Sequence, residues 1–173
     1  EYASGGNYPD LLNRDATEYF IEITHKKYAS ALKNKLGETV TAVFTDEAKA
    51  PLMPLNKALA DKYEATYSES ILPHLPLIAK RTSVTEENVY ILHRWYDLCS
   101  RMFCDNYLLL CKKWANENGL AFTGHLDQDH SPLGCMTGRN FNLMRALRCF
   151  DIPGIDVIWR QLYPENKTVS PND

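Results

Sequence analysis

Amphipathic stretches alternate with short apolar runs along this chain, and the alternation predicts helices and strands in turn. Asn13 is a suitable N-cap, and apolar side chains then recur at roughly helical spacing as far as Leu36. Gly37 follows, at the position where helices commonly end. The next run, residues 40–45, is short, largely apolar and rich in β-branched residues, which indicates a buried strand.

The rest of the chain continues this order. Ser83 and Glu86 form a capping box, which predicts a helix that runs to about Asn118. At about 1.5 Å per residue this helix would be roughly 50 Å long, so we expect a break or bend within it. Residues 120–125 and 155–159 are two further apolar runs, separated by a polar loop and a short helical stretch, and we expect both to be strands.

Helices and strands in this order are typical of an α/β protein with parallel β/α repeats, and the 173 residues are enough for one domain. Residues 1–12 have the composition of a loop, and residues 164–173 form a polar tail. Residues 48–81 are interrupted by four prolines and form an insertion after the first strand. We expect this insertion to lie over the carboxyl end of that strand, where such segments often form walls of substrate sites.

Composition narrows the class of function. The formal net charge of −3 gives no support for binding of nucleic acid, which calls for a basic patch. The chain has no apolar run of about 18 residues, so we expect no contact with a membrane. None of the five cysteines forms a Cys-x-x-Cys pair, and we expect small buried hydrophobic side chains in a reducing, cytoplasmic setting. No metal or other cofactor is predicted.

Side chains that could take part in catalysis or binding follow each of the three predicted strands. The carboxyl ends of parallel strands lie at one side of a sheet, where active sites of α/β proteins collect, so we expect these side chains to converge. They are Asp46 and Glu47 after the first strand, His125, Asp127 and Asp129 after the second, and Trp159 and Arg160 at the end of the third.

Asp46 and Glu47 are the most informative pair because they end a run that is expected to be a buried strand. Burial of a carboxylate costs free energy, so acids at this position suggest a functional role. Adjacent residues on a regular strand point to opposite faces, so both acids cannot face one site. We expect Glu47 to enter the site and Asp46 to bond to the backbone or to a basic group. The structural alternative is that both acids cap the following helix or pair with a basic residue.

Four short motifs occur along most of residues 8–160. They are Tyr8-Pro9-Asp10-Leu11-Leu12-Asn13, Phe44-Thr45-Asp46-Glu47, Thr123-Gly124-His125 and Ile152-Pro153-Gly154-Ile155-Asp156. In sequence and in order they resemble the catalytic barrel of large bacterial glycoside hydrolases, in the broad α-L-rhamnosidase-like and β-galactosidase-like group.

The resemblance implies a (β/α)8 TIM barrel, which takes about 250 residues, so this chain would be a central slice of it. Open sheet edges of such a slice predict self-association. The implied substrate is an oligosaccharide or other glycoside, cleaved by two carboxyl groups, one with a pKa raised by burial or a like charge. Glu47 is the implied general acid/base, and Asp129 is the implied second acid. A strand outside this chain is the alternative source of the second acid.

The other candidates have roles in substrate binding. His125 is expected either to hydrogen-bond a sugar hydroxyl or to hold a carboxylate, with Asp127 close by. Trp159 is expected to stack on a sugar ring and Arg160 to donate hydrogen bonds, with core packing as the alternative for Trp159. Two other functions stay open: a non-catalytic carbohydrate-binding or scaffold domain, and a metal-dependent hydrolase with a divalent-ion site around His125, Asp127, Asp129 and His130.

Overall fold

The centre of the molecule is a small parallel sheet. The structure, a computed structural model, describes residues 8–50, 53–80, 84–138 and 140–156. Within these residues the sheet has three strands in the order β1-β2-β3, and both neighbouring pairs are parallel. The predicted α/β class with parallel repeats is therefore confirmed. The strands are β1 (Ala42–Ala48), β2 (Ala121–Leu126) and β3 (Ile152–Pro153).

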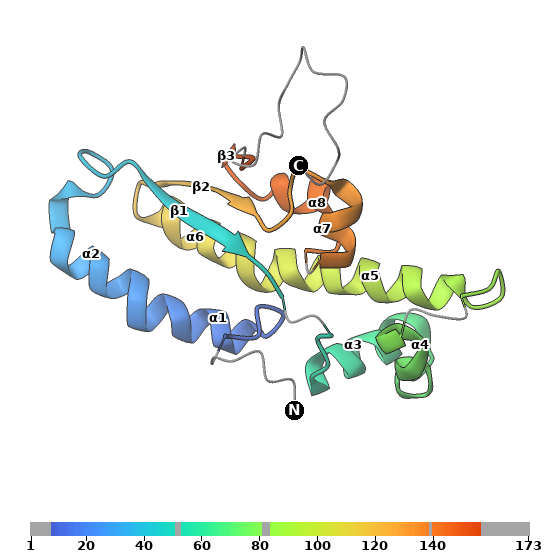
Figure 1. Cartoon of the computed structure of the whole chain (residues 1–173). Helices are drawn as coiled ribbons and strands as arrows, with labels where there is room; N and C mark the ends of the chain where they lie inside the picture. The colour runs from blue at the N-terminus through green and yellow to red at the C-terminus, as the bar shows by residue number, and fades with distance from the viewer. Residues whose placement is uncertain (1–7, 51–52, 81–83, 139, 157–173) are drawn as a thin grey trace, which may run out of the picture.

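The amphipathic N-terminal stretch is a helix that leads into β1 (Figure 1). Asn13 caps it as expected, because its side-chain oxygen accepts a hydrogen bond of 3.0 Å from the backbone of Asp15. Gly37, with φ of 81°, turns the chain after the helix. The helix comprises α1 (Arg14–Phe20), the π-helical turn η1 (Ile21–His25), α2 (Lys26–Leu32) and the 3-10 turn η2 (Lys33–Lys35).

The long helix between β1 and β2 begins later than the sequence predicts. It starts at Val89, since the side chain of Asn88 accepts a hydrogen bond of 2.7 Å from the backbone of Thr85 and favours a turn there. Ser83 of the predicted capping box lies outside the described residues. The expected irregularity is present as a widened π-helical turn. The helix comprises α5 (Val89–Phe103), η4 (Cys104–Leu108) and α6 (Leu109–Glu117).

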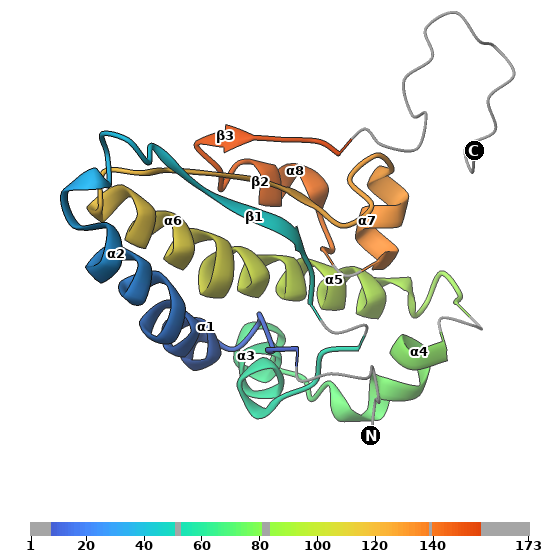
Figure 2. The same cartoon turned by 60° about the vertical axis from the view of Figure 1, so that its left-hand side comes forward.

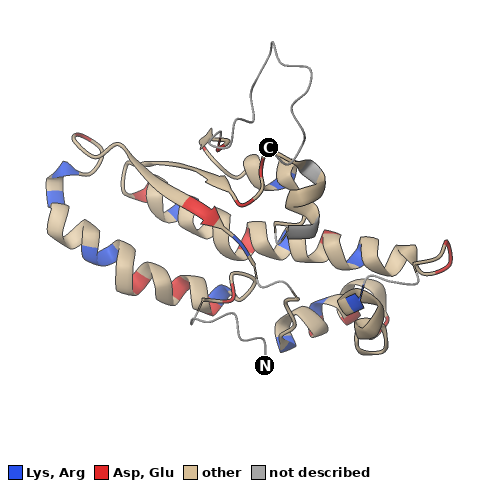
Figure 3. Ribbon diagram, viewed as in Figure 1, with Lys and Arg blue, Asp and Glu red and all other residues tan. Residues whose placement is uncertain are grey.

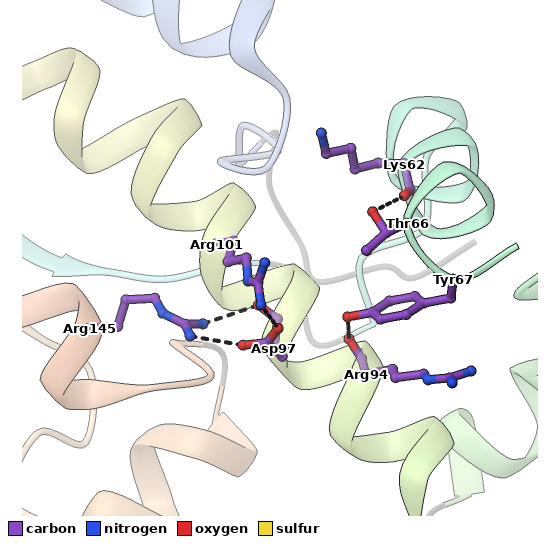
Figure 4. Close-up of polar contacts among 7 residues, drawn as sticks. All are labelled: Lys62, Thr66, Tyr67, Arg94, Asp97, Arg101 and Arg145. Atoms are coloured by element: carbon purple, nitrogen blue, oxygen red, sulfur yellow. Dashed lines mark hydrogen bonds and ion pairs between the residues drawn. The ribbon is translucent and has the colours of Figure 1, made fainter.

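The insertion after β1 lies past the carboxyl end of that strand, as expected (Figure 1). The side chain of Glu69, in this insertion, contacts the guanidinium of Arg94 at 3.0 Å. The hydroxyl of Tyr67 is placed to donate to the backbone oxygen of Arg94 at 3.4 Å (Figure 4). These contacts attach the insertion to α5. Its helices are α3 (Lys57–Tyr67), the 3-10 turn η3 (Leu72–His74) and α4 (Leu75–Lys80).

The third strand differs from the prediction. The predicted run was residues 155–159, of which 155–156 are not in a strand and 157–159 lie outside the described part. The strand β3 is instead the pair Ile152–Pro153, just before the predicted run. Thr123 donates its side-chain proton to the oxygen of Ile152 at 2.7 Å, and the backbone of Gly154 donates to Gly124 at 2.9 Å. These long-range bonds outweigh the local turn preference of the sequence. Two short helices precede β3: α7 (Pro132–Gly138) and α8 (Leu143–Leu147).

The two faces of the sheet have different surroundings. Helices α5, α6 and α8 lie on one side of the strands (Figure 2). We call this side the covered face, and the other side the open face. On the covered face, the stacked rings of Phe122 and Phe150 are 5.0 Å apart. The covered face comprises Val43, Thr45, Ala48, Phe122, Gly124 and Leu126; the open face comprises Phe44, Asp46, Thr123, His125 and Ile152.

Charged contacts and buried thiols complete the packing. Asp97 of α5 contacts Arg145 of α8 at 2.8 Å and Arg101 at 2.6 Å, which joins the two helices (Figure 4). Burial raises the pKa of Asp97, but the hydrogen bonds from Arg145 and Arg101 outweigh it, and its net pKa is lowered. All five cysteines are buried and free, as expected. In the described part of the chain, no helix has the length and apolarity needed to cross a bilayer.

Candidate functional site

A histidine lies between two of the predicted carboxylates. Nε2 of His125 is 2.8 Å from Oδ1 of Asp46, and Nδ1 is 3.6 Å from Oδ2 of Asp129. The expected bond of Asp46 to a basic group is therefore present. The two acids have different surroundings, since the Asp46 side chain is 77% exposed and that of Asp129 is 2% exposed. The structure thus joins the ends of β1 and β2 through one imidazole.

A β-bulge determines where Asp46 and Glu47 point. Thr45 pairs with Gly124 and Ala48 pairs with Leu126, so β1 advances by one residue more than β2. Both Thr45 and Ala48 stay buried, and Asp46 and Glu47 between them are both exposed. The expected separation of the two acids onto opposite faces applies to a regular strand, and the bulge interrupts that regularity between Thr45 and Ala48.

Glu47 occupies an unusual backbone conformation at this bulge. Its φ is 42°, in the left-handed region that residues with a side chain rarely adopt. The expected desolvation of its carboxylate is not found among the described residues, since Glu47 is exposed. A strained residue beside a bulge is a frequent feature of functional sites, where the backbone re-aims a side chain. Glu47 is therefore accessible to a ligand at the carboxyl end of β1.

Asp129 is anchored more firmly than the sequence indicates. Its Oδ2 accepts hydrogen bonds from the backbone of Leu126, at 3.3 Å, and of Asp156, at 3.1 Å. It thereby closes the turn after β2 and attaches the segment that follows β3. A carboxylate with these two backbone contacts and 2% side-chain exposure joins two segments of the chain, and its burial keeps it from touching a substrate.

Asp127 belongs to a separate pair. Its Oδ2 lies 3.3 Å from Nζ of Lys49, and its backbone oxygen accepts a bond of 2.7 Å from the side chain of Asn140. No local pattern in the sequence identifies Lys49 or Asn140, because each contact joins Asp127 to a separate segment of the chain.

An exposed aromatic ring also lies beside the histidine. Phe44 is 59% exposed on the open face, with its ring centroid 5.8 Å from that of His125. A usable signal for it was a large aromatic residue near the end of the apolar run, two positions before the pair of acids. Trp159 and Arg160, which the sequence placed at this site, lie outside the described residues.

Beneath the site, on the covered face, Thr45 and Tyr107 share a hydrogen bond of 2.8 Å between their hydroxyls. Burial is the main cause that raises the pKa of Tyr107. The neutral phenol therefore fixes β1 to η4.

Acidic side chains outnumber basic ones around the site, where Lys49 contacts Asp127, and their arrangement does not favour a metal. Acidic residues lie on the carboxyl-terminal part of β1, whereas Lys and Arg are distributed over several helices (Figure 3). In the part of the chain that the structure describes, no group of three or more His, Cys, Asp or Glu side chains is placed to hold a metal ion. The geometry instead suits hydrogen bonding to a polar ligand.

The comparisons give no relative from which a role could be carried over. No protein-family model matches this chain. No curated protein matches it either, so the functional argument rests on the geometry of the site.

Proposed function

We propose that this chain is part of a glycoside hydrolase whose site lies at the carboxyl ends of β1 and β2. The observation that carries the proposal is the His125 imidazole between Asp46 and Asp129, on the open face of a parallel sheet. Carboxylates and an exposed aromatic ring are the groups that bind and cleave sugars. The proposed architecture is a section of a (β/α)8 barrel with the open face towards its interior.

Glu47 is the proposed general acid/base. It is exposed at the bulge, within one residue of the Asp46–His125 pair, and the insertion that begins after it supplies a surface near the strand end. In the proposed enzyme, a bound sugar displaces water from Glu47 and supplies the burial that this role requires. Asp46 contacts Nε2 of His125, Asp129 lies 3.6 Å from Nδ1, and His125 binds or orients the substrate.

The proposal also states which polypeptide supplies the second carboxyl group. Asp129 is the acid candidate for it in this chain, but two backbone amides and His125 contact its Oδ2 and its side chain is buried. We therefore assign Asp129 a positioning role. The second carboxylate would come from polypeptide outside this chain, at about 5–10 Å from Glu47 as retaining and inverting enzymes require.

The test is Glu47→Gln in the full-length protein, assayed on a panel of aryl and alkyl glycosides. We expect kcat to fall by about 100-fold to 10,000-fold on alkyl glycosides, whose leaving groups need protonation, and less on activated aryl glycosides. KM should change little. The exposed Glu38→Gln, remote from the strand ends, is the matched control and should keep full activity. Unchanged turnover by Glu47→Gln would exclude this residue as the acid/base.

A non-catalytic carbohydrate-binding domain is the second candidate, favoured by one observation. Phe44 presents 59% of its surface on the open face beside His125, as a stacking platform for a sugar ring would. This candidate predicts saturable binding of oligosaccharide without turnover. Phe44→Ala should then weaken binding, measured by calorimetry, while Glu47→Gln has no effect.

A further inference from the structure

Two buried thiols meet where α8 packs against η4. The Cys104 thiol, at the start of η4, donates a hydrogen bond to the sulfur of Cys149, just past the end of α8. The Cys149 thiol is placed to donate to the backbone oxygen of Arg145 at 3.5 Å. Two sulfurs in hydrogen-bond contact are close to the separation at which a disulfide can form.

A second contact holds the same two elements together. Asp97 lies about two helical turns before Cys104 on the long helix, and Arg145 lies about one turn before Cys149. The guanidinium of Arg145 contacts the carboxylate of Asp97 at 2.8 Å and its backbone oxygen at 3.2 Å (Figure 4). The ion pair and the thiol pair therefore follow each other in the same order along both elements. The sulfurs consequently lie in a packed interface between helices.

The backbone at Cys149 is also fixed by contacts of its own segment. Its amide donates to the oxygen of Ala146 at 2.9 Å. The next residue, Phe150, stacks on Phe122 of β2 with ring centroids 5.0 Å apart. Cys104 is held in turn by the helical hydrogen bonds of η4. Formation of a sulfur–sulfur bond therefore requires mainly rotation of the two cysteine side chains.

The five cysteines differ in their access to solvent and in their ionisation. Cys149 is 6% exposed, the largest fraction among them, whereas Cys99 and Cys135 are 0% exposed. The hydrogen bond from Cys104 lowers the pKa of the Cys149 thiol and outweighs the opposite effect of burial. Burial alone raises the pKa of Cys111 to about 12. Because the thiolate is the reactive form of cysteine, we expect Cys149 to react first with a small oxidant.

We propose that Cys104 and Cys149 are an oxidative modification site, a thiol pair that hydrogen peroxide converts into an intramolecular disulfide. The Cys149 thiolate attacks one peroxide oxygen, the O–O bond breaks, and the departing hydroxide takes up the thiol proton as water, which leaves a sulfenic acid. The sulfur of Cys104 then attacks the sulfenic sulfur, the S–O bond breaks, and the hydroxide leaves with the Cys104 proton as a second water. Two thiols are thereby oxidised and one peroxide is reduced. The inference is independent of the proposed glycosidase activity.

The experiment treats the whole reduced chain with hydrogen peroxide, blocks the remaining thiols with iodoacetamide and maps the bonds by tandem mass spectrometry of proteolytic peptides. We expect a bond between Cys104 and Cys149 that dithiothreitol reverses, with the other three cysteines still free. Because the bond closes a loop of about 45 residues, the melting temperature should rise by about 5–10 °C. Circular dichroism during oxidation verifies that the chain stays folded.

Alanine variants separate this pair from the other cysteines. Cys104→Ala and Cys149→Ala should each abolish the disulfide and the rise in melting temperature, whereas Cys111→Ala, on the same long helix, should keep both. Peptide mapping of the unmodified chain decides the question even where an alanine variant does not fold. Bonds between other cysteines, a covalent dimer, or sulfinic acid at Cys149 without a bond would each overturn the proposal. So would five thiols that stay free while the same peroxide oxidises a cysteine peptide.

Discussion

The covered and open faces of the sheet are made from alternate residues of the same strands, yet they differ in what their side chains contact. On the covered face, Phe122 is 2% exposed and stacks on Phe150, whereas on the open face Phe44 is 59% exposed. The carboxylates and His125 gather at the open face and its carboxyl edge. The comparison teaches that one face supplies stability and the other is free for binding.

The largest expected effect comes from truncating the same ring on each face. Phe122→Ala should lower the free energy of unfolding by about 3–5 kcal/mol, because it removes a buried ring and leaves a cavity. Phe44→Ala should change it by less than about 1 kcal/mol. Urea denaturation of the two variants measures the difference. Similar losses would mean that the open face is packed in solution.

Gly124 tests the closeness of β1 and β2 on the covered face. A Cβ there would lie 2.1 Å from the backbone oxygen of Thr45, so Gly124→Ala should destabilise by about 3 kcal/mol. Gly37→Ala is the control, since φ is positive there but the nearest atom is 3.4 Å away. The control should cost about 1–2 kcal/mol in the same denaturation assay. A reversed order would contradict the close approach of the strands.

The two acids that flank His125 give a smaller contrast. Asp129→Ala should cost about 2–3 kcal/mol, because it leaves two backbone amides without a buried acceptor. Asp46→Ala should cost less than about 1 kcal/mol, since its side chain is exposed. Thermal melting of both variants provides the measurement. Equal losses would argue against the positioning role of Asp129.

His25 gives the smallest effect, a dependence of stability on pH. Its ring lies between Phe20 and Trp114, and burial lowers its pKa below the ordinary histidine value of 6.5. The unfolded chain therefore takes up a proton first as pH falls below 6.5, and stability should decrease there, by at most about 1.4 kcal/mol per pH unit. His25→Phe should remove this dependence, and His130→Gln, at an exposed position, should retain it. Urea midpoints between neutral and mildly acidic pH are the readout.

Local patterns predicted most of the elements. The N-cap at Asn13, β1, β2 and the interrupted long helix follow from side-chain periodicity and capping, which depend on neighbouring residues. The third strand could not be located in this way. Bonds from Thr123 and Gly124 select Ile152–Pro153, and these partners are about 30 residues away in sequence.

The candidate site was predictable in its residues and unpredictable in their roles. The ends of parallel strands brought Asp46, His125 and Asp129 together as expected. The bulge that exposes Glu47, and the two amides that anchor Asp129, arise from contacts across the sheet. The contact between Lys49 and Asp127 also joins separate segments, so the sequence did not indicate it.

The sequence by itself determined the parallel α/β class and the residues that meet at the strand ends, because periodicity sets both the element type and the facing of side chains. Only the tertiary structure decided that Asp129 is buried, that both Asp46 and Glu47 are exposed, and that β2 is the strand between β1 and β3. These features depend on strand register and on the close approach of Gly124 to Thr45, which no local stretch of sequence encodes.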